Sequence, residues 1–221
     1  MLVDVPPAGG EGHDRLASPA SKLRENDHAK IQVFHGSVAK TEDVDALFQK
    51  LDGGVDGVIN AAGNLRDRSI LRMSDDDWGE VIGTHLTGTF LVSRAAIASM
   101  MRRGKGGRIL NMTSIVGVRG NLGQANYAAA KAGVIGLTRA LALEVRAAKI
   151  CVNALAPMAD TPMTRNITHM TGDYSAESLA PFALWLMSAA SSHVTGRVFG
   201  AHGSHYFEYT TEATRGVQLA T

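Results

Sequence analysis

The sequence has little cysteine, little proline and no long apolar run, and each shortage excludes a class of protein. Among 221 residues Cys151 is the only cysteine, so an intramolecular disulfide framework is impossible and a reducing compartment is indicated. Cys151 lies in an apolar run that favours an inert buried thiol over a nucleophile. No apolar run approaches the ~18 residues of a membrane-spanning helix, and Asp4, Pro6 and Pro7 interrupt the N-terminus too early for a signal peptide. These absences predict a cytoplasmic protein without a membrane segment.

An excess of one charge is also missing. The chain has 22 lysines and arginines against 21 aspartates and glutamates, which gives no electrostatic case for nucleic acid or a membrane surface as a partner. The eight histidines show no metal-ligand spacing, and Asp75, Asp76 and Asp77 are typical of the first turn of a helix. We therefore expect no metal site and a small molecule as the partner.

Periodic patterns of strands and helices alternate along the chain. The pattern predicts helices over 41–51, capped by Thr41, and over 74–102, capped by Ser74 and disturbed near Gly83–Gly88. Two further helices are expected over 126–145 and 178–188, and strands over 31–34, 55–60, 108–112, 150–155 and 197–199. Residues 5–29 are expected to form a loop with a weak helix around 18–26, and residues 158–176 and the tail from His202 to be irregular.

Strands that alternate with helices of ten or more residues indicate an α/β protein with a parallel sheet covered by helices on both faces. Ligands of such sheets bind beyond the carboxyl ends of the strands. Asn60, Ser114 and Pro157 all fall at or just past the expected strand ends. We therefore expect the functional site along this edge.

Tyr127 and Lys131 are the residues most suggestive of chemistry. They are four residues apart in an expected helix, so a phenol and an ammonium lie on one face, and Ser114 stands thirteen residues before the tyrosine. A neighbouring positive charge favours phenolate, so we expect Lys131 to lower the pKa of Tyr127. Tyr127 could then exchange a proton with an alcohol or carbonyl oxygen, while Ser114 holds that oxygen or, alternatively, only caps a turn.

The turn Asn60-Ala61-Ala62-Gly63, Ser114 and the pair Tyr127-x-x-x-Lys131 together resemble the short-chain dehydrogenase/reductase family over roughly residues 30–200. Each motif alone is common, and the specificity lies in their joint spacing. The resemblance implies a Rossmann-like fold and hydride transfer between a hydroxyl-bearing carbon and a nicotinamide dinucleotide.

A closer likeness extends over further segments. Residues 65–69, 75–78, 85–88, 123–127, 180–186 and 196–199 are similar to the (3R)-hydroxyacyl-CoA dehydrogenase unit of multifunctional β-oxidation enzymes and its bacterial relatives. The 3-oxoacyl-carrier-protein reductases of bacteria share part of this pattern. The likeness implies a 3-hydroxyacyl or 3-oxoacyl thioester, or a similar secondary alcohol or ketone, as the substrate. It also implies a homo-oligomer packed through two long helices.

The resemblance implies a catalytic role for four residues. Tyr127 would exchange the proton, Lys131 would lower its pKa and bind the nicotinamide ribose, and Ser114 would orient the substrate oxygen. His85 stands where many family members carry an asparagine that links the lysine to a water relay. An imidazole can also donate and accept along a proton chain, but a polar residue that satisfies the disturbed helix is an equally open interpretation.

For the cofactor, the resemblance implies that Asn60, Ala61, Ala62 and Gly63 line the adenosine side and that Pro157 leads to the nicotinamide amide. Leu2-Val3-Asp4 is similar to the end of the family's second strand. Asp4 would then bind the adenosine ribose and favour NAD, with NADP not excluded; the alternative is a solvated N-terminal residue. Asn60 and Asn111 could otherwise be ordinary turn residues.

The family's glycine-rich phosphate turn is missing from the sequence. Gly9-Gly10-Glu11-Gly12 is glycine-rich but lacks a flanking strand and helix, so it is better interpreted as a loop. We therefore expect residues 1–221 to form one N-terminally incomplete domain without the first βα unit, with two exposed strand edges and weak NAD binding. The alternative to an active oxidoreductase is a catalytically silent relative that binds no dinucleotide and acts, if at all, as an oligomer subunit.

Overall fold

Two sheets organise the computed structural model, which describes residues 2–4, 32–51, 53–159 and 174–217. The strands are β1 (Leu2–Asp4), β2 (Val33–His35), β3 (Gly57–Asn60), β4 (Gly107–Met112), β5 (Ile150–Pro157), β6 (Val198–His202) and β7 (His205–Glu208). The strands β1 and β2 pair in parallel, and β3-β4-β5-β6 form a parallel sheet that β7 extends in antiparallel. The helices are α2 (Thr41–Lys50), α3 (Asp75–Ile82), α4 (Gly88–Arg103), α5 (Ile115–Arg119), α6 (Ala125–Glu144) and α7 (Ala180–Met187).

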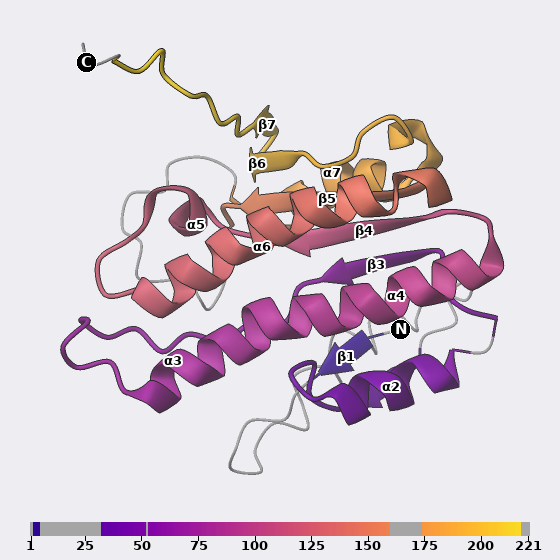
Figure 1. The fold of residues 1–221 in the computed structure, drawn as a ribbon, viewed down its shortest axis with the longest axis horizontal. Helices are drawn as coiled ribbons and strands as arrows, with labels where there is room; N and C mark the ends of the chain where they lie inside the picture. The colour runs from indigo at the N-terminus through magenta and orange to yellow at the C-terminus, as the bar shows by residue number, and fades with distance from the viewer. Residues whose placement is uncertain (1, 5–31, 52, 160–173, 218–221) are drawn as a thin grey trace.

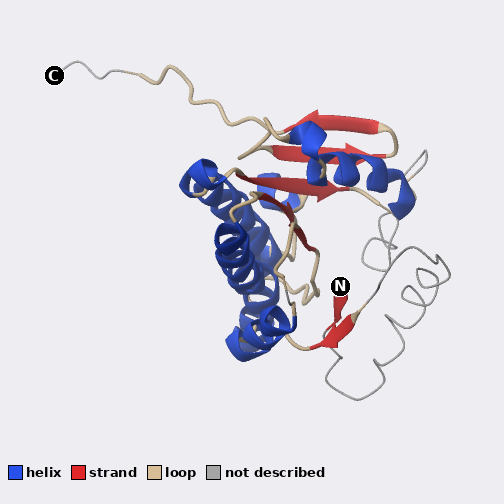
Figure 2. Cartoon of the chain, turned by 90° about the vertical axis from the view of Figure 1, so that its right-hand side faces the viewer, coloured by secondary structure: helices blue, strands red, loops and turns tan. Residues whose placement is uncertain are grey.

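Helices cover both faces of the five-stranded sheet (Figures 1 and 2). Alternate residues of β4 point to opposite faces, so Ile109 packs with Met100 of α4 and Ala142 of α6. Its neighbour Leu110 packs on the other side with Leu186 of α7. The expected α/β class, a Rossmann-like sheet between helical layers, is confirmed.

The long helix before β4 forms as expected. Ser74 accepts the N–H of Asp77 at 3.1 Å, and the Asp77 carboxylate accepts the N–H of Ser74 at 3.2 Å, which completes a capping box at the start of α3. The expected disturbance near Gly83–Gly88 is a π-helical segment, Gly83–Thr87, between α3 and α4. Such bulges are frequent at functional sites, and this one carries the buried His85.

Two expected details are wrong. Thr41 does not cap α2: Lys40 occupies the capping position without a side-chain bond, and Thr41 is already helical. The tail from His202 is only partly irregular: β6 continues to His202 and turns into β7, and the described residues 209–217 form no helix or strand. Gly203 adopts a φ of 51° in the two-residue turn that it forms with Ser204. A glycine followed by serine is a typical turn of this kind, so the hairpin had a sequence signal.

The strand β3 has an open edge. It pairs with β4 on one side, and no described strand pairs with its other side or joins it to β1. The expected interruption of the sheet between the strand ending at Asp4 and the strand ending at Asn60 is therefore present in the described residues. Ile59 of this strand is 49% exposed, so the described residues leave part of one face of β3 uncovered.

Length and composition alone would allow the continuous helical stretch Asp75–Arg103 to cross a membrane, contrary to the sequence-based expectation. Of the most apolar 18-residue window in this stretch, 44% is buried inside the protein. Val81, Ala96 and Met100 are fully buried in that stretch. A core helix passes the same test, so this stretch is weak evidence for a membrane span.

Some expectations lie outside the described residues. The loop over 5–29, the weak helix over 18–26 and most of the irregular stretch over 158–176 belong to this group. The expected helix over 178–188 is present as a 3₁₀ turn, Ala176–Leu179, followed by α7.

Candidate active site

Ser114 and Tyr127 meet beyond the carboxyl end of β4. Ser114 precedes α5 and its hydroxyl accepts the N–H of Val116 at 3.2 Å, so it does cap a turn. The same hydroxyl lies next to the phenol of Tyr127, close enough to act on its pKa. The capping role and the placement beside Tyr127 are therefore compatible. The local fold fixes both side chains, because Ser114 caps α5 and Tyr127 lies in the first turn of α6.

Lys131 lies one turn further along α6 and is only 5% exposed. Its ammonium donates a 2.6 Å hydrogen bond to the carbonyl of Met112 and lies 5.6 Å from the centre of the Tyr127 ring. Burial lowers the pKa of Lys131 to about 8. The carbonyl of Met112, the last residue of β4, thus holds the positive charge of Lys131 near the Tyr127 ring.

The expected lowering of the Tyr127 pKa by Lys131 is wrong. The pKa of Tyr127 is raised, chiefly because burial disfavours the phenolate, although the neighbouring Ser114 hydroxyl opposes this. The carboxylate of Asp67 adds to the rise. The Lys131 ammonium is directed to a backbone carbonyl, so burial decides the direction. Tyr127 is therefore protonated at neutral pH.

His85 faces Tyr127 from the π-helical segment. Its ring is 2% exposed and packs edge-on against the Tyr127 ring, with centroids 5.0 Å apart. Its Nε2 lies 2.8 Å from the carbonyl oxygen and 3.1 Å from the nitrogen of Asn64, and the tautomer decides which bond forms. Its Nδ1 is buried without a hydrogen-bond partner among the described residues. His85 thus joins the π-helical segment to the loop after β3 and keeps one ring nitrogen, Nδ1, without a partner among the described residues.

His85 should make the protein sensitive to acid. Burial, with a contribution from the charge of Lys131, lowers the pKa of His85 from 6.5 to about 4. The unfolded chain binds this proton near pH 6.5 and the folded chain does not, so stability falls as the pH falls from 6.5 to 4. We expect the wild type to lose about 2 kcal/mol more than His85→Asn between pH 7 and 5 in urea unfolding. Equal losses in the two proteins would contradict this assignment.

The Asn60 side chain, which also borders the groove along β3, is bonded to the body of the protein. Its amide donates to Asn111 at 2.8 Å and to Ser93 at 3.0 Å, and Asn111 in turn donates to Thr138 at 2.9 Å. This buried chain joins β3, α4, β4 and α6. The interpretation of Asn60 and Asn111 as ordinary turn residues is wrong, because Asn111 lies inside β4 and is fully buried.

The segment after Asn60 borders a groove of about 680 Å³ along the open edge of β3. Ala61, Ala62 and Gly63 line it with exposed backbone and small side chains, opposite apolar residues of α2 and α4. This composition fits the flat adenosine end of a dinucleotide. Pro157 is the last residue of β5 and pairs with Ala201 of β6. Asp4 is the last residue of β1 and pairs with His35 of β2.

Gly63 passes too close to His85 for any side chain. A methyl group on Gly63 would lie 2.5 Å from Cε1 of the buried His85 ring. We expect Gly63→Ala to cost about 1–3 kcal/mol in urea unfolding, because the ring has no room to retreat. Gly79→Ala is the matched control, since a methyl there meets nothing within 4 Å, and it should stabilise by about 0.5–1 kcal/mol. An unchanged free energy of unfolding in Gly63→Ala would show that the His85 ring can move away from residue 63.

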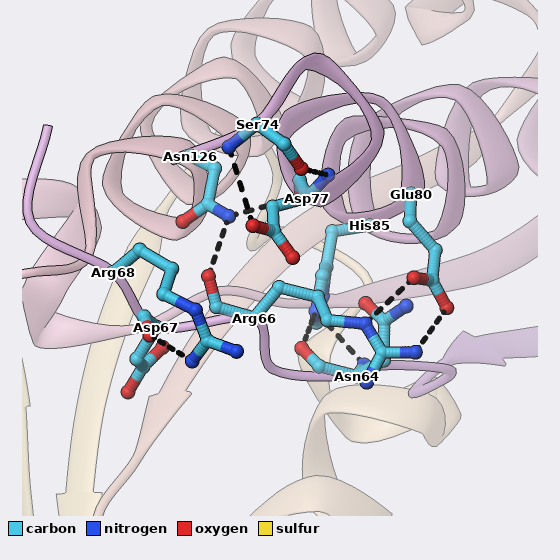
Figure 3. A network of polar contacts seen from close by, with 9 residues as sticks. All are labelled: Asn64, Arg66, Asp67, Arg68, Ser74, Asp77, Glu80, His85 and Asn126. Carbon is cyan, nitrogen blue, oxygen red and sulfur yellow. Dashed lines mark hydrogen bonds and ion pairs between the residues drawn. The ribbon is translucent and has the colours of Figure 1, made fainter. Parts of the chain in front are cut away.

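The loop between β3 and α3 forms a polar network around the site (Figure 3). Arg66 pairs with Glu80 at 2.7 Å, and Asn126 donates to the carbonyl of Arg66 at 3.0 Å. Sequence reasoning missed Asn64 and Asn126. Asn126 had one usable signal, an amide in the first turn of an otherwise apolar helix; Asn64 acts through its backbone, which leaves no such signal.

Comparison with known proteins settles the family. Residues 8–172 match the family model described as short chain dehydrogenase. The chain belongs to the short-chain dehydrogenase family. A crystal structure of a short chain dehydrogenase from Mycobacterium avium superposes with a TM-score of 0.79 at 34% identity, covering 91% of this chain and 72% of that one.

Relatives of this short-chain dehydrogenase include two bacterial reductases. The 3-oxoacyl-[acyl-carrier-protein] reductase FabG of Chlamydia muridarum is 38% identical over 201 residues, covering 84% of this chain and 81% of the relative. FabG of Aquifex aeolicus is 34% identical over 212 residues, covering 89% and 85%. The chain is therefore an NAD(P)-dependent oxidoreductase of this family, similar to bacterial 3-oxoacyl reductases. The expected likeness to those reductases is confirmed, and the likeness to β-oxidation units stays a prediction.

Proposed function

We propose that this chain transfers a hydride between NAD(P) and a 3-oxoacyl or 3-hydroxyacyl thioester, or a similar ketone and secondary alcohol. The observation that carries the proposal is the placement of the Ser114 hydroxyl next to the Tyr127 phenol, with Lys131 buried one helical turn away. Similarity to 3-oxoacyl reductases supports the thioester class. We propose a cytoplasmic location on the same ground and because of the single buried cysteine.

The nicotinamide, when bound, supplies or accepts the hydride. In reduction, the Tyr127 phenol gives its proton to the carbonyl oxygen as that oxygen gains charge, and the Ser114 hydroxyl donates a hydrogen bond to the same oxygen. The Lys131 ammonium then stabilises the phenolate left behind. The raised pKa of Tyr127 keeps this proton in place at neutral pH, which is the protonation state from which the reduction starts. His85 offers its free Nδ1 for returning the proton from solvent.

In this proposal, the residues that bind the dinucleotide lie on both sides of Ser114 and Tyr127. The exposed segment Ala61, Ala62 and Gly63 would hold the adenosine side together with Asn60, whose partly buried side chain bonds to Asn111 and fixes the start of their turn. Lys131 and Tyr127 would hold the nicotinamide ribose and Pro157 its amide. Asp4 would bind the adenosine ribose and make NAD the preferred cofactor over NADP.

A homo-oligomer is the expected assembly. The outer surfaces of α4 and α6 expose Phe90, Met101 and Leu143, which are 40%, 58% and 76% exposed. Large apolar side chains at these positions favour packing of the two long helices against a second copy.

The open edge of β3 favours a second candidate, a catalytically silent relative that binds no dinucleotide. The two candidates differ in one assay. Purified chain is mixed with an acetoacetyl thioester and a saturating concentration of NADH or NADPH, and the absorbance of the reduced nicotinamide is followed. Thioester-dependent loss of absorbance, faster with NADH, supports the oxidoreductase. Absence of both turnover and dinucleotide binding in calorimetry supports the silent relative.

A further inference from the structure

Asn126 joins three segments at the start of α6 (Figure 3). Its side chain is fully buried. The amide nitrogen donates to the carbonyls of Arg66 and Asp77, both at 3.0 Å, and the amide oxygen accepts the N–H of Tyr127 at 2.8 Å. The loop after β3, the first turn of α3 and the backbone of the candidate acid therefore meet on one amide group.

Among the described residues, Asn126 is the side chain that accepts the N–H of Tyr127 at the start of α6. Gln124 occupies the capping position of α6 but makes no capping bond with its side chain. The first N–H groups of a helix lack intrahelical partners, and the Tyr127 N–H is one of them. Both donors of the Asn126 amide are also used, so the group is satisfied although it is buried.

Two more contacts dock the same loop on the same helix start. The N–H of Arg68 donates to the carbonyl of Gly123 at 2.9 Å, and the Gln124 amide donates to the Asp67 carboxylate at 2.8 Å. Arg68 is exposed and the bond between Gln124 and Asp67 is exposed, whereas the Asn126 side chain is fully buried. The Asn126 amide is thus the most deeply buried of the contacts that join this loop to the start of α6.

We propose that Asn126 is a positioning residue for Tyr127, which locks the loop over residues 64–68 onto α6 and so keeps the phenol buried beside Ser114 and His85. The inference rests on the acid role proposed for Tyr127. Without the lock, the loop would separate from the helix start and water would reach the phenol. The phenol would then ionise more easily, and it would no longer be oriented toward the substrate.

Tyrosine absorbance during an alkaline titration tests the lock without dinucleotide or substrate. The chain has four tyrosines, so the signal of Tyr127 is the difference between each protein and its Tyr127→Phe counterpart. In the wild type, burial raises the pKa of Tyr127. In Asn126→Ala we expect the pKa to return towards that of an ordinary tyrosine, and kcat, where turnover is measurable, to fall about 100-fold with nearly unchanged KM.

Asn153→Ala is the matched control. Asn153 is also buried and also joins two segments, donating to the carbonyl of Val194 at 2.9 Å and accepting the N–H of Arg197 at 3.1 Å. Its loss should lower the unfolding temperature similarly but leave the Tyr127 titration unchanged. A purely structural Asn126 would give the same pattern as this control.

Asn126→Ser separates the two functions of the amide and serves if the alanine variant does not fold. A serine hydroxyl can still accept the Tyr127 N–H but is too short to reach both carbonyls. We expect the serine variant to ionise Tyr127 as easily as Asn126→Ala does. A wild-type Tyr127 titration in either folded variant would overturn the proposal, whereas absence of turnover in the wild type would count only against the proposed function.

Discussion

Tyr127→Phe is expected to lower kcat by about 100- to 10,000-fold while the fold remains intact. Phenylalanine keeps the ring that packs against His85 at 5.0 Å but removes the hydroxyl that Ser114 contacts. Positioned acid–base groups contribute acceleration of this size. The measurement is the steady-state rate of thioester reduction, with circular dichroism and thermal unfolding to show that the variant is folded.

Controls for this substitution lie on the same chain. Tyr206→Phe removes a phenol whose hydroxyl donates to the carbonyl of Ser178, far along the sequence from the site, and should leave kcat unchanged. Turnover of Tyr127→Phe within a factor of about three of the wild type would remove Tyr127 from the acid role and leave the proposed mechanism without a proton donor.

Lys131→Met is expected to have the second largest effect, a fall in kcat of about 100-fold or more. Methionine fills similar volume but cannot stabilise the phenolate that Tyr127 becomes. Stability should change little, because removing a buried charge offsets the loss of the hydrogen bond to Met112 at 2.6 Å. The readouts are kcat, the KM for the dinucleotide and the urea midpoint.

The exposed Lys105 supplies the control for charge in general. Lys105→Met should change neither kcat nor KM. Because burial lowers the pKa of Lys131 to about 8, the wild-type ammonium should lose its proton as the pH rises past that value, and part of the same defect should appear there. An unchanged kcat in Lys131→Met would show that the ammonium has only a structural role, the hydrogen bond to the carbonyl of Met112.

The order of most strands and of the long helices was predictable because these elements carry local signals, whereas the short α5 and the strand β7 were missed. Ser74 followed by three aspartates marks a helix start, and the capping box formed by Ser74 and Asp77 follows from that pattern. The glycines at 83 and 88 mark the disturbance that becomes the π-helical segment. The meeting of Tyr127 and Lys131 follows from helical spacing alone.

Other parts of the site depend on contacts that no spacing encodes. The Lys131 ammonium bonds to a backbone carbonyl, and every residue has one, so this partner was invisible in the sequence. The direction of the Tyr127 pKa depends on how much water the folded chain excludes, and burial outweighs the neighbouring hydroxyl. Asn126 was missed for the same reason, since two of its partners are carbonyls from a loop distant in sequence.

Deuterium transfer tests the proposed hydride reaction most directly. The purified chain is given an acetoacetyl thioester and reduced dinucleotide that carries deuterium at the transferring position, and the 3-hydroxyacyl product is examined by mass spectrometry. A product heavier by a single deuterium, formed by the wild type and lost in Tyr127→Phe, is the expected result. An unlabelled product, or labelled product formed equally fast by Tyr127→Phe, would contradict hydride transfer at the site of Ser114, Tyr127 and Lys131.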